Sequence, residues 1–302
     1  MHNWCSPSRR APAPREAFGV PGCPGDYYPI HARRPAMVSP RKNHYDPIYP
    51  KRLDVRAPLL VRYASIAATP PDHVLGEDPS AMESAHEFAR LLERSDAFAK
   101  HLVSLLQRVT SLREDARGLA GRRAAHLTLE HGDAVRILFG AGAPNAACAL
   151  LRSQYEAALR GAWAVYAASN EKVDKLNRPL DLDSEQAAKN LDGSEKMLSA
   201  LKVRAGFNPQ LMGLVIPLDE IRENQWKAMN SFVHGGIHPL QRSGTFPVAL
   251  AAQVVRNSNG ISHIACRLLM RLATQLDDAS VTEMERAYVG FEACVPMTPP
   301  AA

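Results

Sequence analysis

The sequence predicts an all-α protein, in which an irregular, mostly antiparallel bundle of six or seven helices follows an N-terminal tail that we expect to be disordered. Three observations lead to this fold class. Apolar residues recur every three or four positions after residue 82, which is the period of an amphipathic helix. No stretch of 82–294 alternates apolar and polar residues as a half-buried strand would. Residues 1–81, in contrast, hold 14 of the 23 prolines.

The tail is expected to form neither helix nor sheet, because proline fixes φ and lacks the N–H that both require. Such a segment buries too little apolar surface to offset the entropy cost of ordering. We therefore divide the chain into a disordered tail over 1–81, one helical domain over 82–294 and a frayed end over 295–302. A second interpretation stays open, in which translation starts at Met37 or Met82. Peptides upstream of Met37 in N-terminal proteomics would exclude that interpretation.

The basic charge belongs to the tail. Residues 1–81 carry 11 Lys and Arg against 7 Asp and Glu, whereas the rest of the chain carries 25 against 24. A basic protein ordinarily suggests nucleic acid or an anionic membrane as partner, but the predicted domain is close to neutral. No apolar run approaches the roughly 18 residues of a membrane span. Five cysteines without CxxC spacing favour a reducing, cytoplasmic location and no membrane partner.

The first three helices have clear boundary signals. Apolar residues at three- and four-residue steps, from Phe88 onward, predict a helix over about 82–110. A second helix over 112–139 is expected to end at glycines 140 and 142. Proline is favoured in the first turn of a helix, so a third should run from Pro144 to about residue 168.

The second half is predicted from capping residues and breakers. Asp183 or Ser184 is expected to cap a helix that reaches about residue 204. Pro217 should open a helix that ends at Gly235, and Pro239 should prevent its resumption. The remaining expected helices span about 209–215, 246–276 and 280–292.

The third helix has two distinct faces. Placed at 100° steps, small residues including Ala157, Ala158 and Gly161 share one face, and they permit close approach of a partner helix. We therefore expect this helix to be central. Arg152, Glu156, Arg160 and Trp163 fall on the other side.

Arg152, Glu156 and Arg160 form an i, i+4, i+8 ladder, and two interpretations stay open. Such ladders commonly stabilise a helix by tenths of a kcal/mol per pair. Alternatively, two guanidinium groups around a carboxylate line a cleft that binds an anion. With Trp163 on the same face, these residues are the candidate binding residues.

Trp226, Asn230 and His234 are spaced in the same way on the helix that ends at Gly235. A histidine in a last turn is explained by the helix dipole alone. As a functional pair, Asn230 and His234 could position or deprotonate a 2′-hydroxyl. We therefore take Asn230 and His234 as catalytic candidates and Trp226 as a further binding candidate.

No metal or cofactor is expected. His234 and His238 have the spacing of a helical zinc pair, but Gly235, Gly236 and Pro239 interrupt the helix, and no HExxH accompanies them. The chain has no glycine-rich phosphate loop of Walker or Rossmann form.

Two stretches resemble motifs of uncharacterised bacterial all-helical families, which are known as domains of unknown function. The segment 149–157, continued by 160–163, resembles their LxRxxxE…R helix. Trp226 with 230–236 resembles their second motif, a Ser or Asn followed by His-Gly at a helix end. The resemblance covers about 110–292 and implies an all-α fold without an established activity.

A more distant resemblance is to HEPN domains, helical ribonucleases of bacterial toxin and defence systems. Their active sites place an Arg, often followed by Asn, four to six residues before a His. Here Lys227 stands in the region of that Arg, and Asn230 is not next to it.

Two hypotheses for function follow. In the first, the protein is a non-catalytic module that binds a partner or itself, possessing an internal Arg/Glu/His network and forming a homodimer when it self-associates. In the second, which the HEPN resemblance implies, it is a metal-independent ribonuclease that uses Asn230 and His234. Nucleic acid is a partner under the second hypothesis alone.

Overall fold

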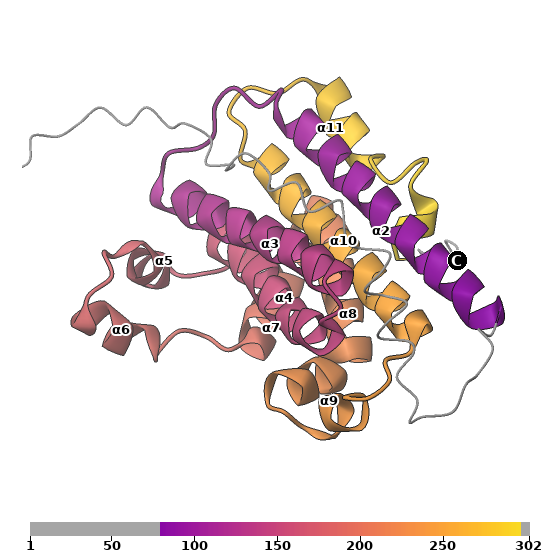
Figure 1. Ribbon diagram of the computed structural model, residues 1–302. Helices are drawn as coiled ribbons and strands as arrows, with labels where there is room; N and C mark the ends of the chain where they lie inside the picture. The colour runs from indigo at the N-terminus through magenta and orange to yellow at the C-terminus, as the bar shows by residue number, and fades with distance from the viewer. Residues whose placement is uncertain (1–78, 297–302) are drawn as a thin grey trace, which may run out of the picture. The chain divides into compact units, whose positions relative to one another are not determined.

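The expected all-α class is confirmed. A computed structural model describes residues 79–296, and in this range the chain forms α-helices and short 3-10 turns without any β-strand (Figure 1). The expected tail, apart from residues 79–81, and the last six residues lie outside the described residues. Six described helices have 14 residues or more, namely α2 (Pro79–Leu106), α3 (Ala116–Gly140), α4 (Pro144–Tyr166), α7 (Ser194–Phe207), α8 (Met212–Val233) and α10 (Val248–Arg271).

Shorter helices lie at the edges of this bundle. They are α5 (Asn170–Asn177), α6 (Leu182–Ala188), α9 (Ile237–Gln241) and α11 (Asp278–Glu285), with 3-10 turns at Pro209–Leu211 and Glu292–Cys294. Figure 1 shows α5 and α6 standing out to one side of α3 and α4, and α11 running along α2.

Helix α4 is central, as its small-residue face predicts. It packs against α3, α7, α8 and α10. More than half of its residues are buried, 13 of 23, so it is enclosed on more than one side. A surface helix would bury a single stripe.

The close approach occurs where α3 crosses α4. A Cβ atom built on Gly161 would lie 3.0 Å from both Ala124 Cβ and Leu268 Cδ2. A Cβ on Gly121 would overlap Val165 Cγ2. Glycine at these two positions therefore sets the distance between the helices.

The turn between α3 and α4 follows from Gly142. Its φ of 74° lies in the left-handed region that glycine adopts without steric cost. Ala143 N–H donates to Leu138 O at 2.8 Å, and Gly142 N–H donates to Phe139 O at 3.1 Å. This is the Schellman arrangement, and it makes α3 and α4 an antiparallel hairpin.

The single helix expected from Asp183 or Ser184 to about residue 204 is wrong, because α6 and α7 are separate. Residues 189–193 include Asn, Asp and Gly, which are poor helix formers. The cap of α6 is Asp181, whose Oδ1 accepts from Ser184 N–H at 2.7 Å.

Pro217 does not open a helix but lies inside α8, which begins at Met212. Proline leaves the carbonyl four residues earlier without its intrahelical donor, and that carbonyl belongs to Gly213. The Arg267 Nη1 atom of α10 donates to Gly213 O, so a side chain replaces the missing backbone bond.

Pro239 does not prevent a further helix either. It occupies the first turn of α9, where N–H groups have no intrahelical partner in any case. The expected stop at Gly235 is confirmed, with φ of 61° there and Gly236 N–H donating to Ser231 O at 2.7 Å.

Candidate functional site

The two helical faces singled out in the sequence meet. Arg152 Nη1 of α4 lies 3.2 Å from Nε2 of His234, the residue that ends α8. Arginine has no acceptor, so Nε2 of His234 is the acceptor in this contact. Arg152 Nε also donates to Glu156 Oε1 at 3.0 Å. His234, Arg152 and Glu156 therefore form one chain of polar contacts, with His234 exposed at its outer end.

The Trp226 ring packs against two guanidinium groups in this region. The guanidinium carbons of Arg152 and Arg222 lie 4.8 and 4.5 Å from its ring centroid, within cation–π range. Tyr155 meets the same ring edge-on at 6.2 Å. Arg222 further donates to Ser194 Oγ at 3.1 Å, so Arg222 ties α8 to the first turn of α7.

A cleft of about 590 Å³ opens beside the Trp226 ring. We call it the α4–α7 cleft. One wall is the predicted ladder of Arg152, Glu156 and Arg160. The opposite wall is formed by Leu176 of α5 and by Leu191, Asp192, Gly193 and Ser194 at the start of α7.

Arg160 is the unmatched charge of the cleft. Arg152 is paired with Glu156, and Asp192 with Lys172 of α5. Arg160 is partly buried, yet no described residue pairs with its guanidinium. A charge that is partly removed from water and left unpaired costs free energy, which distinguishes Arg160 from Arg152 on the same wall.

The start of α7 adds further positive potential to the cleft. Gly193 is its N-cap and supplies no side-chain cap, and the hydroxyl of Ser194 already accepts from Arg222. The first-turn N–H groups have no intrahelical acceptors, and the positive end of the helix dipole lies there. Both Gly193 and Ser194 line the cleft.

Two predicted site residues do not line the cleft. Trp163 is 1% exposed in the core, and its polar neighbour is Lys172, whose Nζ lies 5.8 Å from the ring. Asn230 lies one turn before His234, and its buried Oδ1 has no hydrogen-bond partner among the described residues.

Arg222 was not predicted from the sequence, nor was the α5–α7 wall, as we call the wall of the cleft formed by Leu176 and residues 191–194. Arg222 stands four residues before Trp226 and thus on the same helix face, a signal that was available. Leu191 and Asp192 lie in the unpredicted break between α6 and α7, and nothing in the sequence places that break opposite α4.

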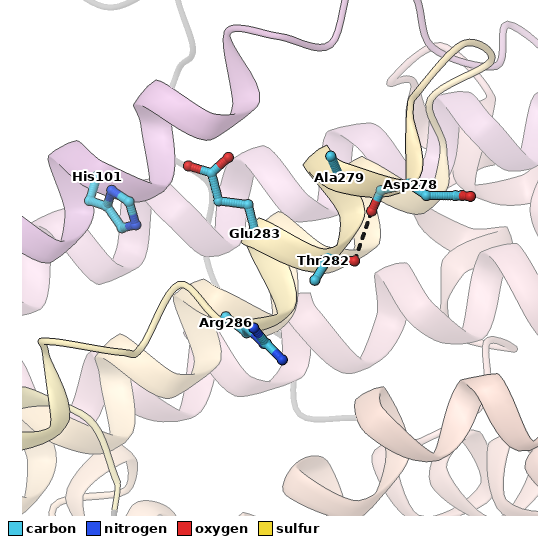
Figure 2. Close-up of a pocket in the computed structure, with 6 residues that line it drawn as sticks. All are labelled: His101, Asp278, Ala279, Thr282, Glu283 and Arg286. Carbon is cyan, nitrogen blue, oxygen red and sulfur yellow. Dashed lines mark hydrogen bonds between the residues drawn. The ribbon is translucent and has the colours of Figure 1, made fainter.

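A second pocket lies between α2 and α11 (Figure 2). His101 of α2 faces the side chains of α11 across it, and Thr282 donates to Asp278 O at 2.8 Å. Its charged residues Asp278, Glu283 and Arg286 are all exposed, so water satisfies them, and Glu283 also pairs with Arg108. This pocket lacks the partly buried, unmatched charge that distinguishes the α4–α7 cleft.

In the part of the chain that the structure describes, no three His, Cys, Asp or Glu side chains are grouped to hold a metal ion. Burial raises the pKa of the Cys148 thiol to about 12, which keeps it protonated and unreactive. No helix between residues 79 and 296 combines the length and apolarity that crossing a bilayer requires.

Comparison with known proteins tests the resemblance to domains of unknown function. No curated protein matches the chain, and no solved structure matches it either. A family model described as a family of unknown function, DUF6988, matches residues 125–297. The match spans more than half of the chain and contains every residue of the α4–α7 cleft, together with Trp226 and His234. The chain therefore belongs to the DUF6988 family.

Proposed function

We propose that the protein is a non-catalytic binding module that holds a small anion in the α4–α7 cleft. The observation that carries this proposal is Arg160, whose partly buried guanidinium has no partner among the described residues and lies on the wall of a cleft of about 590 Å³. Cavities of this size are typical of small-molecule sites, and an anion would supply the missing charge.

The other ladder residues have supporting roles in this proposal. Arg152 is engaged by Glu156, His234 and the Trp226 ring, so it holds the wall in place. Arg160 alone of the two arginines has its donors available to a ligand. In this proposal Arg152 forms the ion pair that stabilises the helix, and Arg160 is the guanidinium that binds the anion.

Arg160→Gln should weaken the binding of small anions by the protein. Charge-assisted hydrogen bonds contribute about 1.5–3 kcal/mol, so its loss should weaken binding at least about tenfold. Binding is measured by NMR chemical-shift titration with acetate and with inorganic phosphate, at an ionic strength held constant with sodium chloride.

The matched control is Arg90→Gln, which removes an exposed arginine of α2 and should bind as the wild type does. If neither acetate nor phosphate binds the wild type, the proposal is wrong. It is equally wrong if Arg160→Gln and Arg90→Gln bind the anions alike.

A ribonuclease is the second candidate, favoured by one specific observation. The exposed His234 lies 3.2 Å from the Arg152 guanidinium, which sets a base beside a positive charge that could stabilise a phosphate. Arg152 would thereby take the place that Lys227 leaves open in the HEPN-like pattern.

His234→Ala tests this candidate directly. If the protein is a ribonuclease, its rate of cleaving a fluorogenic RNA should fall at least about a hundredfold, the usual contribution of an acid–base group. The same loss should not occur in His86→Ala, which changes an exposed histidine of α2. Equal cleavage by wild type and His234→Ala would remove the candidate.

We also propose that the protein self-associates. Phe207 is 83% exposed at the end of α7, and Met212 and Ile216 are exposed at the start of α8. Exposed apolar side chains of this size are often buried in protein interfaces. Sedimentation equilibrium would report the mass of the particle, and Phe207→Ser should lower it if a second copy covers these residues.

A further inference from the structure

We propose that the anion held in the α4–α7 cleft is an organic monocarboxylate with an aliphatic body of several carbons. This inference rests on the proposed function, because it names the class of the ligand that Arg160 would bind. It is carried by two further features of the cleft, namely the balance of its charges, in which Arg160 is the unpaired one, and the apolar side chains of its other wall.

The charges around Arg160 limit the charge of the ligand. Arg152, Arg160 and Lys172 supply three positive charges, and Glu156 and Asp192 supply two negative ones. A monoanion would make this group neutral. A phosphate dianion would leave an excess negative charge close to both carboxylates, which opposes binding.

The opposite wall favours an apolar body. Leu176 and Leu191 line the cleft, and both are partly buried and pack against the hydrophobic core. Their positions are therefore fixed by the core, while part of each side chain remains open to the cleft. Water against such a surface is displaced favourably by hydrocarbon.

The geometry of the charged groups suits a carboxylate. The planar guanidinium of Arg160 can donate two parallel hydrogen bonds to its two oxygens. The uncapped start of α7 at Gly193 and Ser194 places further N–H donors at the cleft. In this arrangement the carboxylate lies at Arg160 and the hydrocarbon lies along Leu176 and Leu191.

The experiment compares hexanoate, acetate and inorganic phosphate by NMR titration at pH 8, where phosphate is a dianion, and at constant ionic strength. Each fully buried methylene strengthens binding about fourfold, and hexanoate has four more methylenes than acetate. Even with partial burial, we expect hexanoate to bind at least about tenfold more tightly than acetate, and phosphate to bind no more tightly than acetate.

The variant Leu191→Ala separates the apolar contribution to binding affinity from the contribution of the Arg160 charge. It should weaken hexanoate binding several-fold and acetate binding much less, because acetate carries a single methyl group, whereas Arg160→Gln should weaken both. Leu127→Ala, which changes an exposed leucine of α3, should bind both ligands as the wild type does. A circular dichroism spectrum checks that each variant is folded.

The outcomes distinguish the two proposals. If phosphate binds more tightly than hexanoate through Arg160, the cleft is an anion site but this inference is overturned. Equal affinities for hexanoate and acetate overturn it too. If neither acetate nor phosphate binds the wild type, the proposed function fails together with the inference.

Discussion

Trp163→Ala should lower the free energy of unfolding by about 3–5 kcal/mol, the range for removing a large aromatic side chain from a core. Trp163 is 1% exposed and is among the largest fully buried side chains in the described part of the chain. It lies on α4, which packs against four other helices, so the surrounding elements cannot collapse easily into the space it leaves.

Urea denaturation followed by circular dichroism would measure this loss, with Tyr288→Ala as the control. Tyr288 is 42% exposed, so its removal should cost less than about 1 kcal/mol. A loss below about 1.5 kcal/mol for Trp163→Ala would contradict the burial of this residue. The folded Trp163→Ala protein should still bind anions, because Trp163 does not line the cleft. If this variant folds fully but no longer binds anions, Trp163 is a binding residue after all.

Gly121→Val should destabilise the protein by about 3 kcal/mol, at the upper end of the usual cost of overpacking a core. Even the first carbon of the new side chain would overlap Val165 Cγ2 and lie 3.2 Å from Leu272 Cδ1. The two helices would have to separate, and the contacts between α3 and α4 would be lost along their length.

A double-mutant cycle shows whether this overlap is the cause. Adding Val165→Ala should restore at least about 1 kcal/mol to the Gly121→Val protein, because contacting residues are energetically coupled. The control is Gly206→Val near the end of α7, where a Cβ would meet nothing within 4 Å. If Gly121→Val and Gly206→Val unfold at the same urea concentration, the proposed close approach is wrong.

Local signals explain why most of the fold could be predicted. Gly142 and Gly235 both adopt positive φ at the ends where glycine was expected to stop a helix. The central position of α4 followed from its small residues, since side-chain volume on one face determines how closely a helix can pack.

Helix boundaries were predicted wrongly where a residue distant in the sequence supplies a hydrogen bond or ion pair that the local segment cannot form. Pro217 breaks a helix unless another donor satisfies the carbonyl that it leaves free, and Arg267 provides that donor. Asp192 lies in an unpredicted break and is held by Lys172, twenty positions earlier. Neither partner can be identified from spacing within a single element.

The candidate site was predicted only in part, because it also depends on contacts between residues that are distant in the sequence. Periodicity placed Arg152, Glu156 and Arg160 on one face of α4, and Trp226 and His234 on one face of α8. That these faces meet depends on how the helices pack. The lack of a partner for Arg160 depends on the α5–α7 wall, which only tertiary structure reveals.

The bond from Arg267 to Gly213 also bears on the order in which the chain folds. Residues 212–217 cannot complete their own helical ladder, since Pro217 provides no N–H to Gly213 O. The replacement donor stands 54 positions later and reaches that carbonyl after α10 has docked. We therefore expect the first turns of α8 to become protected from amide hydrogen exchange later in refolding than the hairpin of α3 and α4, whose turn is closed by local bonds.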